Sequence, residues 1–184
     1  VAVGAQLAVA VHGSVVLDLA MGDALGGPMS TDLLHPGFCT TKPLLALAVG
    51  LLIDRGEVAL DDPIRPSWFD PGATVTLREL LDHDAGLQEP HALDWRICPV
   101  EERADLLPGR PATHRAAYSE LAAGIVLEEL VESLTGRAAA DVVHDEVVAP
   151  LELDDELIVC ARRAAAPTAA ARLTAPFSGL PERR

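Results

Sequence analysis

An apolar run from Leu44 to Ile53, directly preceded by Cys39-Thr40-Thr41-Lys42-Pro43, constrains the fold more than any other feature. A run of this kind, ended by Gly56, predicts a buried helix with Pro43 in its first turn, where a missing N–H costs little. On a helix that spans residues 39–54, Cys39 and Lys42 share a face because they are three residues apart. The stretch therefore predicts a thiol beside an amine at the start of a helix.

Lys42 is the only lysine in a chain that has 13 arginines. Arginine stays charged, so it cannot replace a lysine that must lose and regain a proton. Thiols at helix N-termini beside a cation ionise more readily, and a thiol next to an amine is a candidate nucleophile with its own base. The alternative is that Cys39 is a small buried hydrophobe and Lys42 an exposed first-turn residue, because a short C-x-x-K pattern is not specific.

The composition narrows the class of protein. A length of 184 residues suits one domain with a real core, and no apolar stretch of about 18 residues predicts a membrane span. The net charge of −14 argues against binding to nucleic acid or anionic lipid. Cys39, Cys98 and Cys160 lie far apart without zinc-type spacing, so we expect no disulfide framework, metal or cofactor. No signal peptide follows Val1, which predicts a cytoplasmic protein unless the native N-terminus lies elsewhere.

Local patterns predict an antiparallel hairpin and several helices. Two β-prone runs, 5–10 and 14–20, flank His12-Gly13, which suits a tight turn. The predicted helices cover residues 39–54, 76–83, 121–134 and 138–148, the second with a capping box formed by Thr76 and Glu79. Asp61 and Asp62 predict a turn and cap rather than a metal site, because no further ligands stand at useful spacing. Residues 88–111 are irregular and Pro-rich, and we expect residues 161–184 to be a poorly ordered tail.

Tyr118 is the only tyrosine and stands immediately before the helix predicted at residues 121–134. A single tyrosine in this place can be a packing residue with its hydroxyl at the surface.

Seven segments of the chain, taken in order along the sequence, form a recognisable combination of motifs. They are the N-terminal hairpin, residues 29–32, 39–42, 60–63 and 75–87, the tyrosine motif 118–120, and residues 150–151. Together they resemble the serine β-lactamase and penicillin-binding-protein superfamily, and most closely its class C β-lactamase-like branch, which includes family VIII carboxylesterases and related acyltransferases. The resemblance covers most of residues 5–155. It implies an α+β, β-lactamase/transpeptidase-like fold in which residues 1–160 form a partial domain: a sheet hairpin at 5–20, the nucleophile helix at 39–54 and a helical region at 75–150.

The resemblance also implies a mechanism. Cys39-Thr40-Thr41-Lys42 stands where the family has S-x-x-K, so Cys39 would be the nucleophile, Lys42 the general base and Tyr118 the proton relay to the leaving group. The backbone N–H of Cys39 would supply half of an oxyanion hole. The implied reaction is acyl transfer through a covalent acyl-enzyme, on a small-molecule ester, thioester or lactam.

The chain departs from the family pattern at three points. Cysteine replaces the nucleophilic serine, so the intermediate would be a thioester, and a thiol needs less activation than a hydroxyl. Glu120 replaces the asparagine usual in β-lactamases, and an acid near Lys42 favours the charged amine and so opposes its role as base. Esterases of this branch are less strict at that position, which directs the expectation toward ester or thioester substrates. The family's C-terminal strands, with their K-T-G or H-x-G motif, are not recognisable in residues 156–184, and a lone hairpin leaves an exposed edge.

Two classes of function stay open. The first is an esterase, thioesterase or transacylase that uses Cys39, Lys42 and Tyr118. The second is a catalytically impaired or partner-dependent β-lactamase-like binding module, completed by a second chain or segment that supplies further strands. The lone lysine and lone tyrosine favour the enzyme, whereas Glu120 and the unrecognised C-terminal half favour the module.

Overall fold

The computed structural model describes residues 4–24, 27–35, 37–66, 69, 72–87, 117–119 and 121–159. The chain divides into two compact units, one built from residues 1–37 and 155–184, the other from residues 38–154. Several features named above lie outside the described residues, namely Glu120, Cys98, Cys160, the segment 88–111 and the tail 161–184. Within the described part of the chain, no helix is long and apolar enough to cross a membrane.

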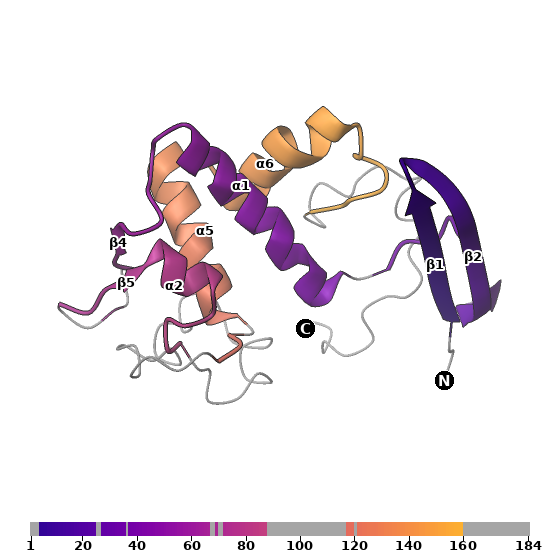
Figure 1. Ribbon diagram of the computed structural model, residues 1–184, viewed down its shortest axis with the longest axis horizontal. Coiled ribbons are helices and arrows are strands. Elements are labelled where there is room, and N and C mark those ends of the chain that lie inside the picture. The colour runs from indigo at the N-terminus through magenta and orange to yellow at the C-terminus, as the bar shows by residue number, and fades with distance from the viewer. Residues whose placement is uncertain are drawn as a thin grey trace, which may run out of the picture. The chain divides into compact units, whose positions relative to one another are not determined.

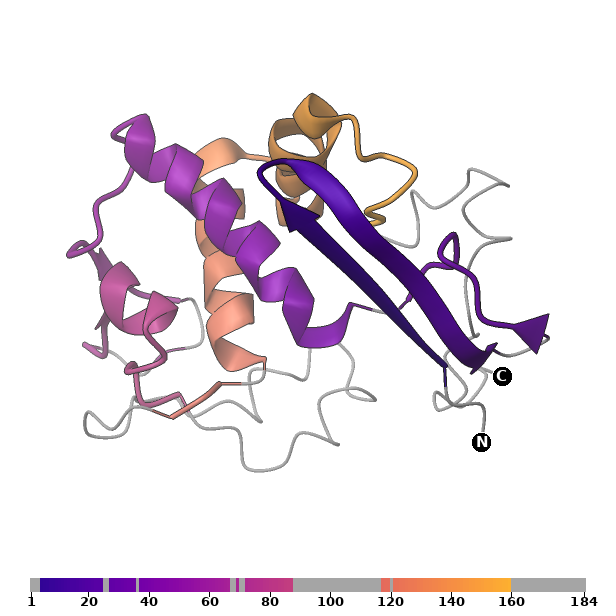
Figure 2. The ribbon, with the colours of Figure 1, turned by 45° about the vertical axis from the view of Figure 1, so that its right-hand side comes forward.

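The first unit contains a three-stranded antiparallel sheet of order β1-β2-β3, formed by Gly4–Val11, Ser14–Ala24 and Gly27–Pro28. The predicted hairpin is therefore present and is longer than predicted. Its turn has positive φ at both His12 (50°) and Gly13 (78°), which is the pattern of the type I′ turn that matches strand twist. Figure 2 shows β1 and β2 as a long ribbon beyond this turn.

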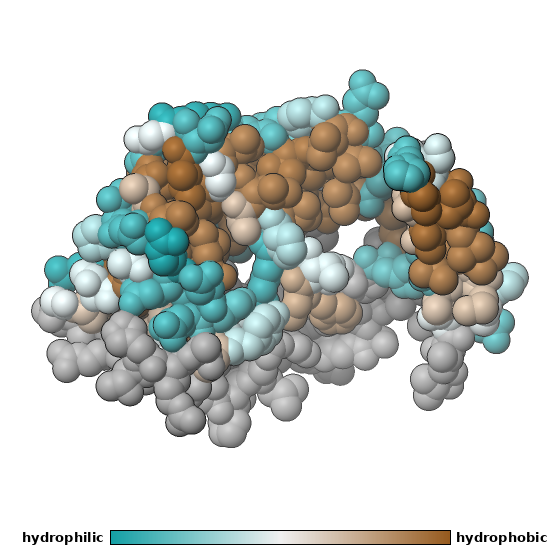
Figure 3. Space-filling model, viewed as in Figure 1, coloured by the Kyte–Doolittle hydropathy of each residue, from teal (hydrophilic) through white to brown (hydrophobic). Residues whose placement is uncertain are grey.

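One face of the hairpin is apolar and exposed. Leu7 pairs with Leu19 and Val9 with Leu17, so their side chains lie on the same face. Leu7 is 49% exposed and Leu19 is 43% exposed. Figure 3 shows a brown, apolar surface over β1 and β2. A strand pair with this pattern is typical of a sheet whose apolar face packs against another layer of structure.

The second unit is helical. Its main elements are η1 (Phe38–Thr41), α1 (Lys42–Asp54), α2 (Leu77–Leu81), α5 (Ala122–Thr135) and α6 (Ala139–Val143), followed by a π-helical turn η3 (His144–Val148) and a 3-10 turn η4 (Ala149–Leu151). Two short strands, β4 (Pro63–Ile64) and β5 (Val75–Thr76), pair with each other before α2. Helix α1 packs against α5 and α6, and α5 also contacts α2 (Figure 1).

The core of the helical unit lies where these helices meet. Its fully buried side chains are apolar and include Val49, Leu52, Leu77, Leu80, Val126, Val131, Val142 and Val148. The helix predicted to be buried is only partly buried in α1: Ala48, Val49 and Leu52 are buried, whereas Leu47 is 55% exposed. Helices α5 and α6 cover one face of α1, and an apolar surface remains over this helix in Figure 3.

The turn and cap predictions are confirmed. Asp62 accepts a hydrogen bond from the Ala59 N–H at 2.8 Å, and Asp61 forms an ion pair with Arg78 at 2.8 Å. The Thr76 hydroxyl accepts the Glu79 N–H at 3.2 Å, while Glu79 accepts the Thr76 N–H at 2.7 Å, which completes the capping box at the start of α2.

Candidate active site

The stretch that carries Cys39 begins as a 3-10 turn, whereas the sequence predicted an α-helix from residue 39. Residues Phe38–Thr41 form η1, and the α-helix starts only at Lys42, with Pro43 in its first turn. Tight turns of this kind are common at helix N-termini. In a 3-10 turn, side chains three residues apart eclipse each other, so Cys39 and Lys42 align more closely than on an α-helix.

Cys39 and Lys42 are in direct contact. The Lys42 Nζ donates a hydrogen bond to the Cys39 Sγ over 3.5 Å. Cys39 is exposed, which rules out the alternative of a small buried hydrophobe, and Lys42 is half-buried. The thiol is therefore both accessible and next to a cationic side chain, as a nucleophile requires.

Tyr118 joins this pair from the segment before α5. The Lys42 Nζ lies 4.9 Å from the centroid of the Tyr118 ring, and the two side chains also share a hydrogen bond. A cation over an aromatic ring at this distance is attracted by the ring's negative face. The structure thus brings together all three residues that the sequence singled out.

Lys42 stays protonated in this environment. Partial burial lowers the pKa of its amine, but hydrogen bonds to Tyr118 and Cys39 and the attraction of both groups outweigh burial, so the pKa is raised above its ordinary value of 10.5. At neutral pH the group beside Cys39 is therefore an ammonium. An ammonium in contact with a thiol stabilises the thiolate.

His83 is a site residue to which the sequence analysis gave no role. Its ring lies against Tyr118 with 4.7 Å between ring centroids and an angle of 42° between the planes. Its Nδ1 accepts the Ser119 N–H at 3.2 Å, and its carbonyl accepts the Ala117 N–H at 2.9 Å. One histidine therefore holds the residues on both sides of Tyr118.

Ser119 completes the support of Tyr118. Its side chain is buried, and its hydroxyl accepts the Ala123 N–H at 2.9 Å in the first turn of α5. This bond satisfies a helix N–H that has no partner within the helix. The signal for His83 in the sequence was its place at the end of the helix predicted at residues 76–83; in the structure its φ is 57°. Isolated histidines are common elsewhere, so that signal alone was weak.

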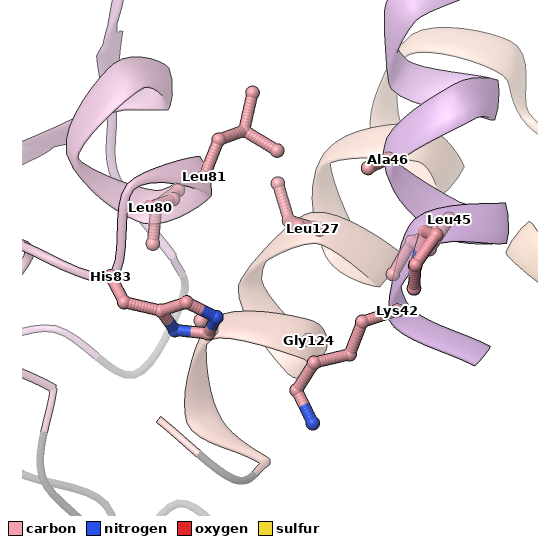
Figure 4. Close-up of a pocket in the computed structure, with 10 residues that line it drawn as sticks. Lys42, Leu45, Ala46, Leu80, Leu81, His83, Gly124 and Leu127 are labelled. Carbon is pink, nitrogen blue, oxygen red and sulfur yellow. The ribbon is translucent and has the colours of Figure 1, made fainter. Parts of the chain in front are cut away.

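A pocket of about 350 Å³ adjoins these side chains between α1, α2 and α5. Figure 4 shows Lys42 from α1 and His83 from the end of α2 pointing into it from different elements, with Gly124 of α5 between them. Among the described residues no group of three or more side chains is arranged to hold a metal ion.

The sequence profile of the family described as Beta-lactamase matches residues 1–182. The chain belongs to the beta-lactamase family. Its α+β architecture is that of the family's fold, and the resemblance to the β-lactamase and penicillin-binding-protein superfamily is confirmed at that level.

Two relatives from this family have esterase in their names. The chain is 32% identical over 165 residues to the esterase/beta-lactamase LipL of Mycobacterium tuberculosis, which covers 82% of this chain and 38% of LipL. It is also 32% identical over 181 residues to esterase EstB of Burkholderia gladioli, with 83% and 46% covered. The chain thus spans less than half the length of either relative.

Solved structures agree on the fold. A beta-lactamase/D-alanine carboxypeptidase from Yersinia pestis superposes with a TM-score of 0.68 at 22% identity, over 84% of this chain and 49% of that protein. At this identity the likeness concerns the fold alone. As with the sequence relatives, about half of the solved chain has a counterpart here.

Proposed function

We propose that this chain carries the nucleophile of an acyl-transfer hydrolase and forms a covalent acyl-enzyme on Cys39. The observation that carries the proposal is the hydrogen bond of 3.5 Å between the Lys42 Nζ and the Cys39 Sγ, with Tyr118 in contact with the same amine. Membership of a family whose matched relatives are named esterases supports a carbonyl substrate.

In the proposed reaction, Cys39 reacts as a thiolate beside the Lys42 ammonium, and the thiolate adds to the carbonyl carbon of the donor. The bond from the acyl carbon to the leaving group then breaks, and the leaving group takes a proton from Lys42 through the Tyr118 hydroxyl. Water, or an acceptor alcohol in a transacylation, attacks the thioester. The acyl group leaves as an acid or a new ester, the proton of the attacking water or alcohol passes to Lys42, and Cys39 is released as a thiolate beside the ammonium.

The raised pKa of Lys42 fits a cysteine better than a serine. A serine nucleophile needs a neutral amine to accept its proton, because the hydroxyl does not ionise at neutral pH. A thiol ionises a few pH units lower, so it can lose its proton to water before the donor arrives and remain as a thiolate beside the ammonium. We therefore propose that Lys42 acts first as the partner of the thiolate and then as the acid for the leaving group.

We propose an ester or thioester as the substrate, in line with the class C-like, family VIII branch. The direct test is the intact mass of the protein after exposure to p-nitrophenyl butyrate, a butyryl thioester and a penicillin, with peptide mapping of the modified residue. We expect one acyl group on Cys39, absent in Cys39→Ala and formed much more slowly in Lys42→Met.

Lys42→Arg separates the two roles of the lysine. Arginine keeps the cation beside the thiolate but cannot return a proton. We expect this variant to accept an acyl group from the activated p-nitrophenyl ester yet to lose activity toward alkyl esters, whose leaving group needs a proton. A folded protein without any adduct, or one labelled equally at Cys98 and Cys160, would contradict the proposed function.

A second candidate is a module that becomes active only with further strands from a second chain or segment. It is favoured by the exposed apolar face formed by Leu7, Val9, Leu17 and Leu19. The test is acylation of Cys39 with and without a separate polypeptide that carries the part of EstB beyond the matched segment. The module predicts an adduct only in the mixture, whereas acylation of the chain alone at the same rate rejects it.

A further inference from the structure

The pocket beside Lys42 has an almost wholly apolar lining. Eight of its lining residues are apolar or glycine, and they come from three helices: Pro43, Leu45, Ala46, Leu80, Leu81, Ala123, Gly124 and Leu127. The other two are Lys42 and His83. Its volume of about 350 Å³ lies at the lower end of the range for small-ligand sites.

The polar groups are gathered on one side of this pocket. In Figure 4 the nitrogen atoms of Lys42 and His83 lie toward one side, whereas Leu81, Leu127 and Ala46 surround the other. A charged or strongly polar group placed among these leucines would lose its water without gaining a partner. The lining therefore favours a ligand whose hydrocarbon chain lies among the leucines and whose polar end lies near Lys42.

We propose that the pocket takes the hydrocarbon chain of the acyl group that is transferred to Cys39, so that its depth sets the preferred acyl length. This inference rests on the proposed function. Lys42 belongs both to the lining and to the contact with the Cys39 Sγ, so a chain bonded to the acyl carbon on that sulfur passes along the Lys42 side chain into the pocket. The substrate class is then an ester or thioester of an unbranched fatty acid.

A larger side chain in place of Gly124 would fill part of the pocket. A Cβ added at this glycine meets no heavy atom within 4 Å, so a larger side chain has open space to enter. Replacing a glycine in a helix interior also removes its unfavourable helix propensity. Gly50 of α1 provides the matched control, because it is exposed, lies outside the pocket lining and also has open space around an added Cβ.

The experiment measures the rate of Cys39 acylation by thioesters of one leaving group with acyl chains from acetyl to decanoyl. Each buried methylene should raise the rate about two- to fourfold until the pocket is full, after which the rate levels or falls. In Gly124→Leu the maximum should move to acyl groups shorter by about two or more carbons, and the loss of rate should be larger for long acyl groups than for acetyl. Gly50→Leu should keep the wild-type profile.

The outcomes separate this inference from the function on which it rests. No acylation of Cys39 by any donor rejects the proposed function. Acylation that is independent of chain length in the wild-type protein, or a Gly124→Leu profile that superposes on the wild type, overturns the acyl pocket while leaving the function intact. If Gly124→Leu does not fold, Gly124→Ala and the wild-type series still decide, because the smaller variant adds only one methyl group.

Discussion

The hairpin and the helical unit both contain apolar side chains, but the hairpin exposes them whereas the helical unit buries many of them. In the hairpin, the facing side chains Leu7 and Leu19 are nearly half exposed. In the helical unit, Leu52 and Val126 are fully buried between α1, α5 and α6. A helix can bury one face against another helix nearby in sequence, whereas a two-stranded ribbon has no layer of its own to cover it.

The side chains of the candidate active site lie in one of these two units. Cys39, Lys42, His83 and Tyr118 all belong to the helical unit, and their contacts with one another lie within that unit. The hairpin supplies none of these contacts. In the proposed reaction, the side chains that carry the first steps therefore all lie in the helical unit.

The largest effect is expected from a core truncation in the helical unit. Leu52→Ala removes a fully buried side chain from α1 and should lower the free energy of unfolding by about 2–5 kcal/mol. The matched change in the hairpin, Leu19→Ala, should stay within about 0.5 kcal/mol because that side chain is largely exposed. Urea unfolding followed by far-UV circular dichroism measures both. Equal losses would show that the hairpin face is covered.

The next effect concerns the support of Tyr118. His83→Ala removes the ring beside Tyr118 and the acceptor of the Ser119 N–H. Acylation by alkyl esters should fall about 10- to 100-fold, since Tyr118 passes the proton to the leaving group. Activated p-nitrophenyl esters should suffer much less. His35→Ala in the other unit is the control, and an equal loss for both ester types would leave His83 with a structural role only.

A smaller effect is expected at the start of α2. Thr76→Ala removes the capping box with Glu79 and should cost about 1 kcal/mol of stability. Thr76→Ser keeps the hydroxyl and should restore most of the loss. Urea unfolding again provides the measurement, and an unchanged midpoint for Thr76→Ala would show that α2 does not depend on its cap.

The smallest effect on stability is expected from polar substitutions on the hairpin face. The double variant Leu7→Thr with Leu19→Thr introduces β-branched strand formers and should leave the unfolding midpoint of the helical unit unchanged. It should lower binding of a hydrophobic dye, because the two side chains are part of the exposed apolar face. Unchanged dye binding would place the accessible apolar surface elsewhere, for example on α1.

The predictions from the sequence were most accurate for features that depend on interactions between residues close in the chain. The hairpin turn at His12-Gly13, the capping box at Thr76 and the turn at Asp61-Asp62 all follow from local backbone and hydrogen-bonding rules. The identity of Cys39, Lys42 and Tyr118 as a cluster came from unusual residue usage and the family pattern. Both signals are independent of packing.

Packing decided the features that the sequence did not predict. The one-sided burial of α1 depends on where α5 and α6 lie against it, which no periodicity in an all-apolar run can indicate. The role of His83 depends on a contact across 35 residues with Tyr118. The direction of the Lys42 pKa likewise required the distances to Cys39 and Tyr118, since burial alone would have lowered it.

The central claim is that Lys42 holds Cys39 as a thiolate. The most direct measurement is the rate of Cys39 alkylation by iodoacetamide from pH 5 to pH 10, in the wild-type protein and in Lys42→Met. Because the pKa of Lys42 is raised above 10.5, the ammonium persists over this whole range in the wild type. The rate should therefore reach half its maximum at a clearly lower pH than in Lys42→Met. Two superposed profiles would contradict the account.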